Sequence, residues 1–416
     1  MSVLVTAPVL IPLATAALTA FTGERPRLQQ GLSAAGALAF LAAALWLVAQ
    51  VAETGSVGVH FGNWPVPYGI AFELDRLSGA LVLVTALMGG AVLLFMASEA
   101  DPTPTHPLLL PLVHGTLAGV AGAFSTADLF NLYVWFEVML ICALGLIALG
   151  GRRDQLDAAF KYLGLNLFGT LLLLAAVGLL YAATGHLNYQ ALATAARAVD
   201  PALLHALLAA LAVALLLKSA AFPLYAWLPA SYPTLPTPVL ALFAGLLTKV
   251  GVYAVLRMLG DVFMPAGADW SEALGWVAAA TMVAGVLGAA YHWDIRRILA
   301  FHIISQIGYI LLAVALDVDV KTLRDEAERL RDTLGSSVVV LANREDTRPV
   351  DALWDGESPV YYQLAGNALE LFPTPQGAHT LKIQYATGFN PTTLASQLVC
   401  RDGWDSWIVF ATCILV

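Results

Sequence analysis

The chain has 416 residues, of which 59% are hydrophobic and only 12% are charged, and its formal net charge is −9. This charged share is about half that of a soluble domain, which excludes a wholly water-soluble globular protein and places most of the chain in a bilayer. The cysteines Cys142, Cys400 and Cys413 have no metal-binding spacing and cannot form a disulfide framework, so the sequence indicates neither a metal site nor a redox centre.

The apolar runs predict an all-α polytopic membrane protein. The first run, MSVLVTAPVLIPLATAALTAF, lacks the basic region of a secretory signal, so we expect it to remain as a first transmembrane helix. Windows of about 20 apolar residues predict about ten spans. These are residues 2–21, 31–52, 77–97, 107–124, 128–149, 159–182, 201–228, 237–258, 272–290 and 296–316.

Basic residues are unevenly divided between the loops. The loops after odd-numbered spans hold Arg25, Arg27, Arg152, Arg153, Lys161, Arg296 and Arg297, whereas the loops after even-numbered spans hold Arg76, Arg197 and Arg257. The positive-inside rule then places the N-terminus outside and the loops after odd-numbered spans in the cytoplasm. With ten spans, the segment from Asp317 also starts outside.

Three ionisable residues lie well inside predicted spans. Glu137 is near the middle of DLFNLYVWFEVMLICALG in the fifth span, and Lys218 and Lys249 lie in the seventh and eighth. Each charge costs about 2.5 to 3.5 kcal/mol at a helix centre, whereas a leucine returns only about 0.3 to 0.6 kcal/mol. Two interpretations stay open on residue types alone. One is a structural Glu137–Lys218 ion pair with Lys249 snorkelling or facing water, and the other is a chain of titratable sites that passes protons.

The seventh span carries its own interruption. In AVALLLKSAAFPLYAWLPASYPTLPTP, Lys218 precedes Pro223 by five residues. Proline lacks a backbone donor and clashes with the carbonyl of Ser219, so we expect the helix to kink or break there. Broken intramembrane helices usually line a cavity or a pathway.

A histidine lies in the tenth span. His302 occurs in RRILAFHIISQIGY, with Gln306 one turn later on the same face and Ser305 beside it. Histidine titrates nearest to neutral pH and can relay a proton, but a lone histidine is also a common hydrogen-bonded packing residue. Both interpretations remain open at this point.

At these residues the sequence resembles a known family. The stretches FNLYVWFEVMLICALGLIALGG, LLKSAAFPLYAWLPASYPTLPTPVLALFAGLLTKVGVYAVLRM and DIRRILAFHIISQIGYILLAVAL resemble the D subunit of the Mrp-type multisubunit Na⁺/H⁺ antiporters, which are homologous to antiporter-like subunits of respiratory complex I. The resemblance implies that Glu137, Lys218 and Lys249 match the family's fifth-helix glutamate, broken-helix lysine and eighth-helix lysine. With His302, they would form the proton pathway.

The resemblance runs from Met1 to about Leu316. Family members have about fourteen helices in two inverted five-helix repeats, and here the second repeat is expected to stop after two helices. We therefore expect a truncated antiporter fold that contains the inward half-pathway and lacks the outward exit.

The remaining residues are polar, with 22 charged side chains in residues 317–416. From Val320, VKTLRDEAERLRDTLGSSVVVLANRED predicts a helix and a strand and resembles the DHH-associated segment of alanyl-tRNA synthetases, or is an ordinary surface helix and strand. Then PVYYQLAGNALELFPTPQGAHTLKIQYATGF predicts a hairpin at Gly366-Asn367 and a third strand, and looks like a β-meander of phage virion proteins.

We therefore divide the chain into three parts. Residues 1–316 are a transmembrane antiporter-like domain, 317–345 a helix-strand segment, and 346–416 a β-rich tail of foreign type. A fused or chimeric reading frame is the favoured interpretation, and a genuine accessory domain is the alternative.

The predicted function is that of a proton-conducting membrane subunit of a cation (Na⁺)/proton antiporter in the bacterial inner membrane, with other Mrp subunits, protons, Na⁺ and lipid as partners. No cofactor, metal or nucleic acid is expected, and the chain would not itself be an oxidoreductase. The alternatives are an antiporter-like subunit of complex I or of a membrane hydrogenase, and a non-transporting chimeric product with a virion-type tail.

Overall fold

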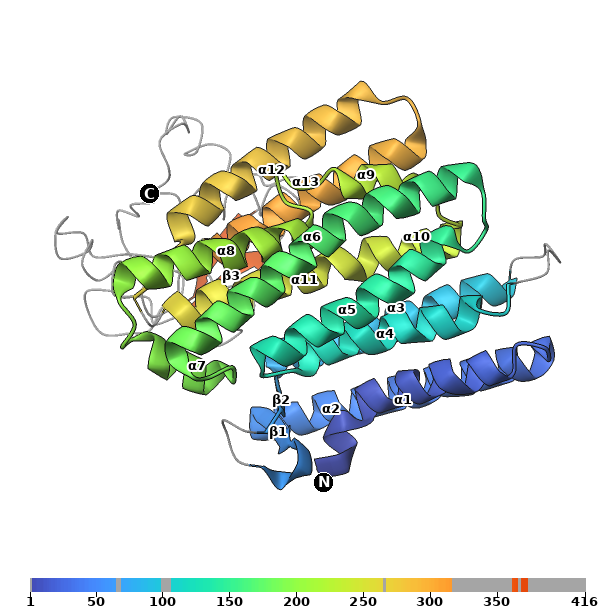
Figure 1. Ribbon diagram of the computed structural model, residues 1–416, viewed down its shortest axis with the longest axis horizontal. Helices are drawn as coiled ribbons and strands as arrows, with labels where there is room; N and C mark the ends of the chain where they lie inside the picture. The colour runs from blue at the N-terminus through green and yellow to red at the C-terminus, as the bar shows by residue number, and fades with distance from the viewer. Residues whose placement is uncertain are drawn as a thin grey trace. The chain divides into compact units, whose positions relative to one another are not determined.

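The computed structural model describes residues 2–64, 69–98, 106–264, 267–315, 361–365 and 368–372. The chain divides by its internal contacts into two units, Met1–Asp317 and Val318–Val416. The first unit is a helical bundle (Figure 1). Its elements are α1 (Ser2–Phe21), α2 (Pro26–Thr54), β1 (Ser56–His60), η1 (Phe61–Asn63), β2 (Ala71–Asp75), α3 (Arg76–Ser98), α4 (Leu109–Ser125), α5 (Leu129–Ala148), α6 (Arg153–Thr184), α7 (Tyr189–Ala196), α8 (Pro201–Ser219), α9 (Trp227–Ser231), η2 (Tyr232–Thr234), α10 (Thr237–Leu242), η3 (Phe243–Leu247), α11 (Thr248–Val255), η4 (Leu256–Phe263), α12 (Ser271–Tyr291) and α13 (Ile295–Ala315).

The predicted membrane helices are present. Among the described residues, nine helices are long and apolar enough to cross a membrane, and α4 is a tenth, shorter apolar helix. Nearly every residue of α4 is buried, so α4 occupies the middle of the bundle, between α1, α3 and α5. The all-α polytopic fold class is thus confirmed.

Two predicted boundaries were wrong. The seventh span was predicted to reach residue 228, but α8 ends at Ser219 and a separate short helix, α9, follows. The eighth was predicted to end at residue 258 with Arg257 in the adjoining loop, whereas α10, η3, α11 and η4 form one continuous helical run, Thr237–Phe263, that contains Arg257. This run includes two π-helical stretches, η3 and η4, which apolar periodicity does not reveal.

A hairpin that the sequence did not predict covers one end of the bundle. Strands β1 and β2 pair antiparallel, with Ser56 opposite Asp75 and His60 opposite Ala71. Isolated bridges join Phe72 to Thr126 and Asp128 to Asn188, so the loops after the second, fourth and sixth spans meet there. In Figure 1, β1, β2 and α7 accordingly lie at the same end.

The opposite end is held by basic side chains. The Arg152 guanidinium donates to the Thr234 carbonyl at 3.2 Å, and the Arg296 guanidinium donates to the carbonyls of Pro233 and Leu235 at 3.2 and 3.0 Å. The short connection after α9 is therefore fixed by arginines at two other loops, Arg152 just before α6 and Arg296 in the first turn of α13. All of these loops follow odd-numbered spans, so their common location agrees with an alternating path through the bundle.

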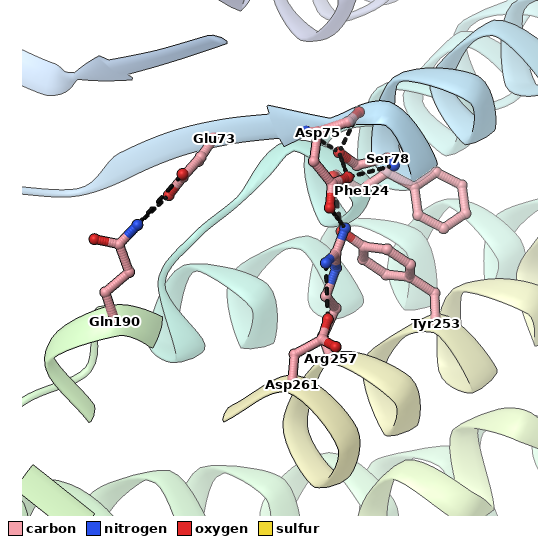
Figure 2. Close-up of polar contacts among 8 residues, drawn as sticks. All are labelled: Glu73, Asp75, Ser78, Phe124, Gln190, Tyr253, Arg257 and Asp261. Atoms are coloured by element: carbon pink, nitrogen blue, oxygen red, sulfur yellow. Dashed lines mark hydrogen bonds and ion pairs between the residues drawn. The ribbon is translucent and has the colours of Figure 1, made fainter. Parts of the chain in front are cut away.

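A polar cluster connects the hairpin to the helical run that contains Lys249. Figure 2 shows the Arg257 guanidinium between two carboxylates, with nitrogen–oxygen distances of 2.6 Å to Asp75 and 2.8 Å to Asp261. Arg257 also donates to the Tyr253 hydroxyl at 3.0 Å, and that hydroxyl donates to the Phe124 carbonyl at 3.2 Å. Beside the cluster, Gln190 of α7 donates to the carboxylate of Glu73.

Of the second unit, the structure describes one antiparallel pair, β3 (Tyr361–Ala365) with β4 (Ala368–Phe372). Ala365 lies opposite Ala368, which is the register expected of a two-residue hairpin. The predicted turn residues Gly366-Asn367, the helix-strand segment 317–345 and the third strand lie outside the described residues.

We predict that the glycine between α8 and α11 cannot be replaced without loss of stability. A Cβ built on Gly251 would lie 2.6 Å from the Ser219 nitrogen and 2.8 Å from the Lys218 carbonyl carbon, which are backbone atoms. Gly251→Ala should therefore lower the free energy of unfolding by about 1–3 kcal/mol, measured by thermal unfolding in detergent. Gly178→Ala in α6, where an added Cβ meets nothing within 4 Å, is the matched control. Equal stability of the two variants would contradict this packing.

We also predict that the Arg257 cluster weakens in acid. Burial alone would raise the pKa of Asp75, but hydrogen bonds from Arg257 and Ser78 outweigh it and hold the pKa below its ordinary value. The carboxylate thus adds stability at pH values above its ordinary pKa, and this stability is lost as pH falls through the lowered value. Asp75→Asn should lower the unfolding temperature at pH 7 and make it less sensitive to pH below about 4. An unchanged acid profile in Asp75→Asn would show that the pairing does not contribute.

Candidate functional site at the helix break

The break after α8 is built from specific backbone hydrogen bonds. The Ala221 amide donates to the Leu216 carbonyl and the Ala220 amide to the Leu217 carbonyl, both at 3.0 Å, which is the Schellman arrangement that ends helices. Ala220 takes the left-handed conformation, with φ of 59°, and is the one non-glycine with positive φ in the described residues. The break predicted at Pro223 is present, and the helix ends four residues before that proline.

Two side chains supply further hydrogen bonds to the interrupted backbone. The Trp227 indole nitrogen donates to the Leu217 carbonyl at 3.0 Å, and the Phe222 amide donates to the Thr281 hydroxyl of α12 at 3.0 Å. Inside a membrane an unpaired backbone group costs several kcal/mol, so these bonds make the break tolerable there. They also fix the orientation of the last turn of α8.

That last turn holds Lys218 against α6. The side chain is buried, with 6% of its surface exposed. Its ammonium donates to the Thr170 hydroxyl at 2.7 Å and to the Asn166 carbonyl at 3.2 Å, and lies 5.7 Å from the ring centroid of Phe136. The lysine is therefore solvated by α6 in place of water.

A small cavity adjoins the ammonium. It has a volume of about 20 Å³, which is room for one water molecule. Its lining comes from α5, α6, α8, α9 and η3, namely Phe136, Met139, Leu140, Tyr162, Asn166, Lys218, Trp227 and Leu247. The lysine thus borders a space that one water molecule can occupy.

Glu137 does not form the direct ion pair with Lys218 that the sequence suggested. The four ion pairs among the described residues do not include it, and its Oε1 atom is buried without a hydrogen-bond partner in the described part of the chain. Phe136, the residue before Glu137, lies 5.7 Å from the Lys218 ammonium by its ring centroid, so Glu137 and Lys218 occur on neighbouring parts of α5 and α8. The structural ion-pair interpretation is corrected accordingly, because Thr170 and Asn166 take the hydrogen bonds of the ammonium.

Lys249 lies in a separate environment on α11. Its ammonium donates to the Ala244 carbonyl, five residues earlier in η3, at 2.7 Å. The side chain is half-buried, so Lys249 does not simply snorkel to the surface. Gly251, two residues later, contacts the backbone at Lys218 and Ser219, so the two lysines occur on helices in close contact.

His302 faces outward from the described bundle. His302 and Gln306 are both exposed, whereas Ile303, Ile304 and Ser305 between them are buried. The structure therefore brings Glu137 and Lys218 onto neighbouring parts of α5 and α8 and packs the helix of Lys249 against α8. No hydrogen bond or ion pair joins His302 to any of these three residues. The polar face of α13 is left uncovered by the described helices.

Sequence reasoning missed the residues that hold Lys218. Thr170 and Asn166 lie one turn apart on α6, and Tyr162 lies a further turn away on the same buried face. This polar stripe at four-residue spacing in an otherwise apolar helix was the available signal. Phe136 and Trp227 gave no such signal, because aromatic residues are common in membrane helices.

Comparison with known proteins gives a consistent result. Residues 126–322 match the family model described as NADH:quinone oxidoreductase/Mrp antiporter, TM. The chain is 35% identical over 317 residues to the Na⁺/H⁺ antiporter D subunit of Alkalihalophilus pseudofirmus, covering 76% of this chain and 64% of that protein. It is 37% identical to the protein of the same name in Bacillus subtilis, covering 74% of this chain and 63% of that protein.

Solved structures agree with these matches. The Mrp complex of a Dietzia species superposes with a TM-score of 0.70 at 34% identity, over 76% of this chain and 59% of that chain. An archaeal respiratory membrane complex, the membrane-bound sulfane sulfur reductase, gives a TM-score of 0.70 at 28% identity, over 76% of this chain and 65% of that chain. The chain thus spans less than two thirds of the length of these relatives. Residues 126–322 are thus similar to the NADH:quinone oxidoreductase/Mrp antiporter transmembrane family, and the resemblance of the chain to the Mrp-type D subunits is confirmed.

Proposed function

We propose that the chain is a proton-conducting membrane subunit of a multisubunit cation/proton antiporter, with Na⁺ as the cation named for its relatives. The observation that carries this proposal is Lys218, a lysine that is 6% exposed inside a membrane bundle at a helix break. Structural stability does not require such a group, because a leucine would be favourable where the lysine costs about 2.5–3.5 kcal/mol. A transporter role is favoured over an enzymatic one by the same relatives.

The geometry supports a stepwise transfer. The Lys218 ammonium is held by neutral groups of α6, while the unpaired Oε1 atom of Glu137 is an acceptor within electrostatic range. Movement of either side chain changes the separation of the two charges and so the tendency of Lys218 to release its proton. The cavity beside Lys218 gives that proton a water to reach, and Lys249 on the adjacent helix is the next basic site.

The uncovered face of α13 indicates where further groups belong. His302 and Gln306 are exposed there, and exposed polar residues are unfavourable against lipid. We propose that this face packs against further helices of an assembled complex and that His302 continues the pathway across that contact. Residues 1–316 then provide the inward half of the pathway, and the groups beyond His302 must be supplied from outside this segment.

The first test is transport in a bacterial strain that lacks its Na⁺/H⁺ antiporters. A fusion protein joins residues 1–316 to the remaining helices of the Bacillus subtilis relative and is produced together with the other Mrp subunits. Glu137→Ala and Lys218→Ala should each abolish exchange in vesicles, and the double variant should be no worse than either, since both residues serve one step. Additive, partial losses would count against a shared step.

The control is a lysine that lies outside the proposed pathway. Lys161 forms an exposed ion pair with Asp157 at 2.6 Å, so Lys161→Ala should leave exchange nearly unchanged. The chain with its own residues 317–416 should insert but give little exchange. If it matches the fusion protein, residues 317–416 are functional and the chimeric interpretation is wrong.

We further propose location in the bacterial inner membrane with the N-terminus outside. In a variant with Cys142, Cys400 and Cys413 replaced by serine, a new cysteine at exposed Ser56 should react with an impermeant maleimide on intact cells. A new cysteine at Asp154, whose side chain is 56% exposed, should react only after permeabilisation. Labelling of position 154 from outside would reverse the orientation.

A specific observation also supports the alternative of a respiratory complex subunit. The TM-score to the sulfane sulfur reductase complex equals that to the Mrp complex, although the identity is lower. Redox subunits encoded beside this gene, or purified with its product, would favour this alternative, and Mrp subunits would favour the antiporter.

A further inference from the structure

Several threonine hydroxyls in the membrane helices form a hydrogen bond within their own helix. A threonine inside a helix can donate its hydroxyl to the carbonyl four residues earlier, which pairs the hydroxyl without any outside partner. The described threonines that do so within these helices include Thr15, Thr19, Thr85, Thr116, Thr184 and Thr281. This bond satisfies a buried donor that would otherwise be unpaired in an apolar environment.

Thr248 does not form this hydrogen bond. It is completely buried, at 0% exposed, and its hydroxyl has no hydrogen-bond partner in the described part of the chain. The carbonyl four residues earlier belongs to Ala244, and the ammonium of Lys249 occupies that carbonyl at 2.7 Å. The lysine has therefore taken the acceptor that the neighbouring threonine would ordinarily use.

Lys218 occupies the carbonyl of a threonine in the same way. The carbonyl four residues before Thr170 belongs to Asn166, and the Lys218 ammonium donates to it at 3.2 Å. The Thr170 hydroxyl then accepts from the ammonium at 2.7 Å and makes no bond to Asn166. Two membrane lysines on different helices thus each displace one threonine hydroxyl from its carbonyl.

We propose that Thr248 is a positioning residue for Lys249, whose hydroxyl takes over the Ala244 carbonyl when the lysine gives up its proton. This inference rests on the proposed function, since it concerns how one site of the pathway releases its proton. Thr170 stands in the corresponding relation to Lys218 and Asn166.

The change of donor at the Ala244 carbonyl follows from the relative strengths of the ammonium and the hydroxyl as hydrogen-bond donors. An ammonium forms a charge-assisted hydrogen bond, roughly twice as strong as a neutral one, so protonated Lys249 holds the carbonyl and leaves the hydroxyl unpaired. When the ammonium passes one proton to a water of the pathway, it becomes a neutral amine and the water becomes hydronium. The amine is then the weaker donor, so the hydroxyl binds the carbonyl and the amine is free to move. The threonine thereby stabilises the deprotonated state.

No other charged group competes for this role among the described residues. The titratable side chains on elements packed against α11 are His114 on α4, His205 and Lys218 on α8, Arg257 and Asp261 on η4, and Arg296, Arg297, His302 and Tyr309 on α13. None of them has a hydrogen bond or ion pair to Lys249, and the same holds for Tyr253 on α11 itself. The carbonyl and the adjacent hydroxyl are therefore the groups that respond to its charge.

The test is to remove the hydroxyl while keeping the shape. Thr248→Val in the assembled antiporter complex should slow exchange about tenfold, because one buried hydrogen bond is lost from the deprotonated state alone. The pH of half-maximal exchange should rise by about one unit, since the lysine keeps its proton longer. Thr248→Ser, which keeps a hydroxyl, should restore both the rate and the pH profile.

The matched control is Thr85→Val in α3. Thr85 is also 0% exposed, but its hydroxyl already donates to Leu81, so its removal costs stability and should leave the pH profile unchanged. Assembly of each variant is checked by the yield of intact complex. If Thr248→Val does not assemble, Thr248→Ala lacks the same hydroxyl and carries the same expectation.

The outcomes separate this inference from the proposed function. If Lys249→Ala abolishes exchange but Thr248→Val behaves like Thr85→Val, the positioning role is wrong while the pathway stands. A failure of Thr248→Ser to restore the pH profile also overturns the positioning role. If Lys218→Ala and Lys249→Ala both exchange normally, the pathway itself is wrong.

Discussion

The break after Ser219 is the constraint on which the rest of the site depends. A continuous helix would pair its own carbonyls and amides and leave neither free for a neighbouring tryptophan donor or threonine acceptor. Here the Schellman bonds, the Trp227 indole and the Thr281 hydroxyl together replace the missing helical turn. Because each bond comes from a different element, α8, α9 and α12 are held in one arrangement, and Lys218 is fixed one residue before the helix ends.

Lys218 is buried and Lys249 is half-buried, and neither forms an ion pair with a carboxylate of the described residues. The charge of Lys218 is shared between a hydroxyl and a carbonyl of α6, and that of Lys249 rests on a carbonyl of η3. Hydrogen bonds to neutral partners lack the direct charge-charge attraction of an ion pair, and in the proposed function this allows each lysine to release its proton. The Oε1 atom of Glu137 is buried without a hydrogen-bond partner in the described part of the chain. A tight Glu137–Lys218 pair would favour stability over transfer.

Features with a local cause were predictable from the sequence. The spans follow from runs of apolar residues, and the break from the clash that Pro223 makes within its own turn. Asp200 at the start of α8 caps it by accepting from the Leu203 amide, as an aspartate before Pro201 suggests. The three charges in the spans were visible as candidates because charge in an apolar run is costly wherever it points.

Features that depend on how helices rotate against each other were not predictable. The spacing of residues along the chain does not show whether Lys218 meets Glu137 on α5 or Thr170 on α6. That choice depends on how the helices are rotated against one another. His302 illustrates the same limit, since its outward direction depends on which face of α13 packs against α12. The π-helical turns and the β1–β2 hairpin with its Arg257 cluster arise from tertiary contacts that a single sequence does not display.

The most direct test of this account is an experimental structure of the chain in lipid nanodiscs, at a resolution that shows lysine side chains. The account predicts that α8 ends at Ser219, that the Lys218 ammonium lies within hydrogen-bond distance of the Thr170 hydroxyl and the Asn166 carbonyl, and that the Glu137 carboxylate does not form an ion pair with it. A continuous helix through Pro223, or a direct Glu137–Lys218 ion pair in place of the α6 contacts, would contradict it.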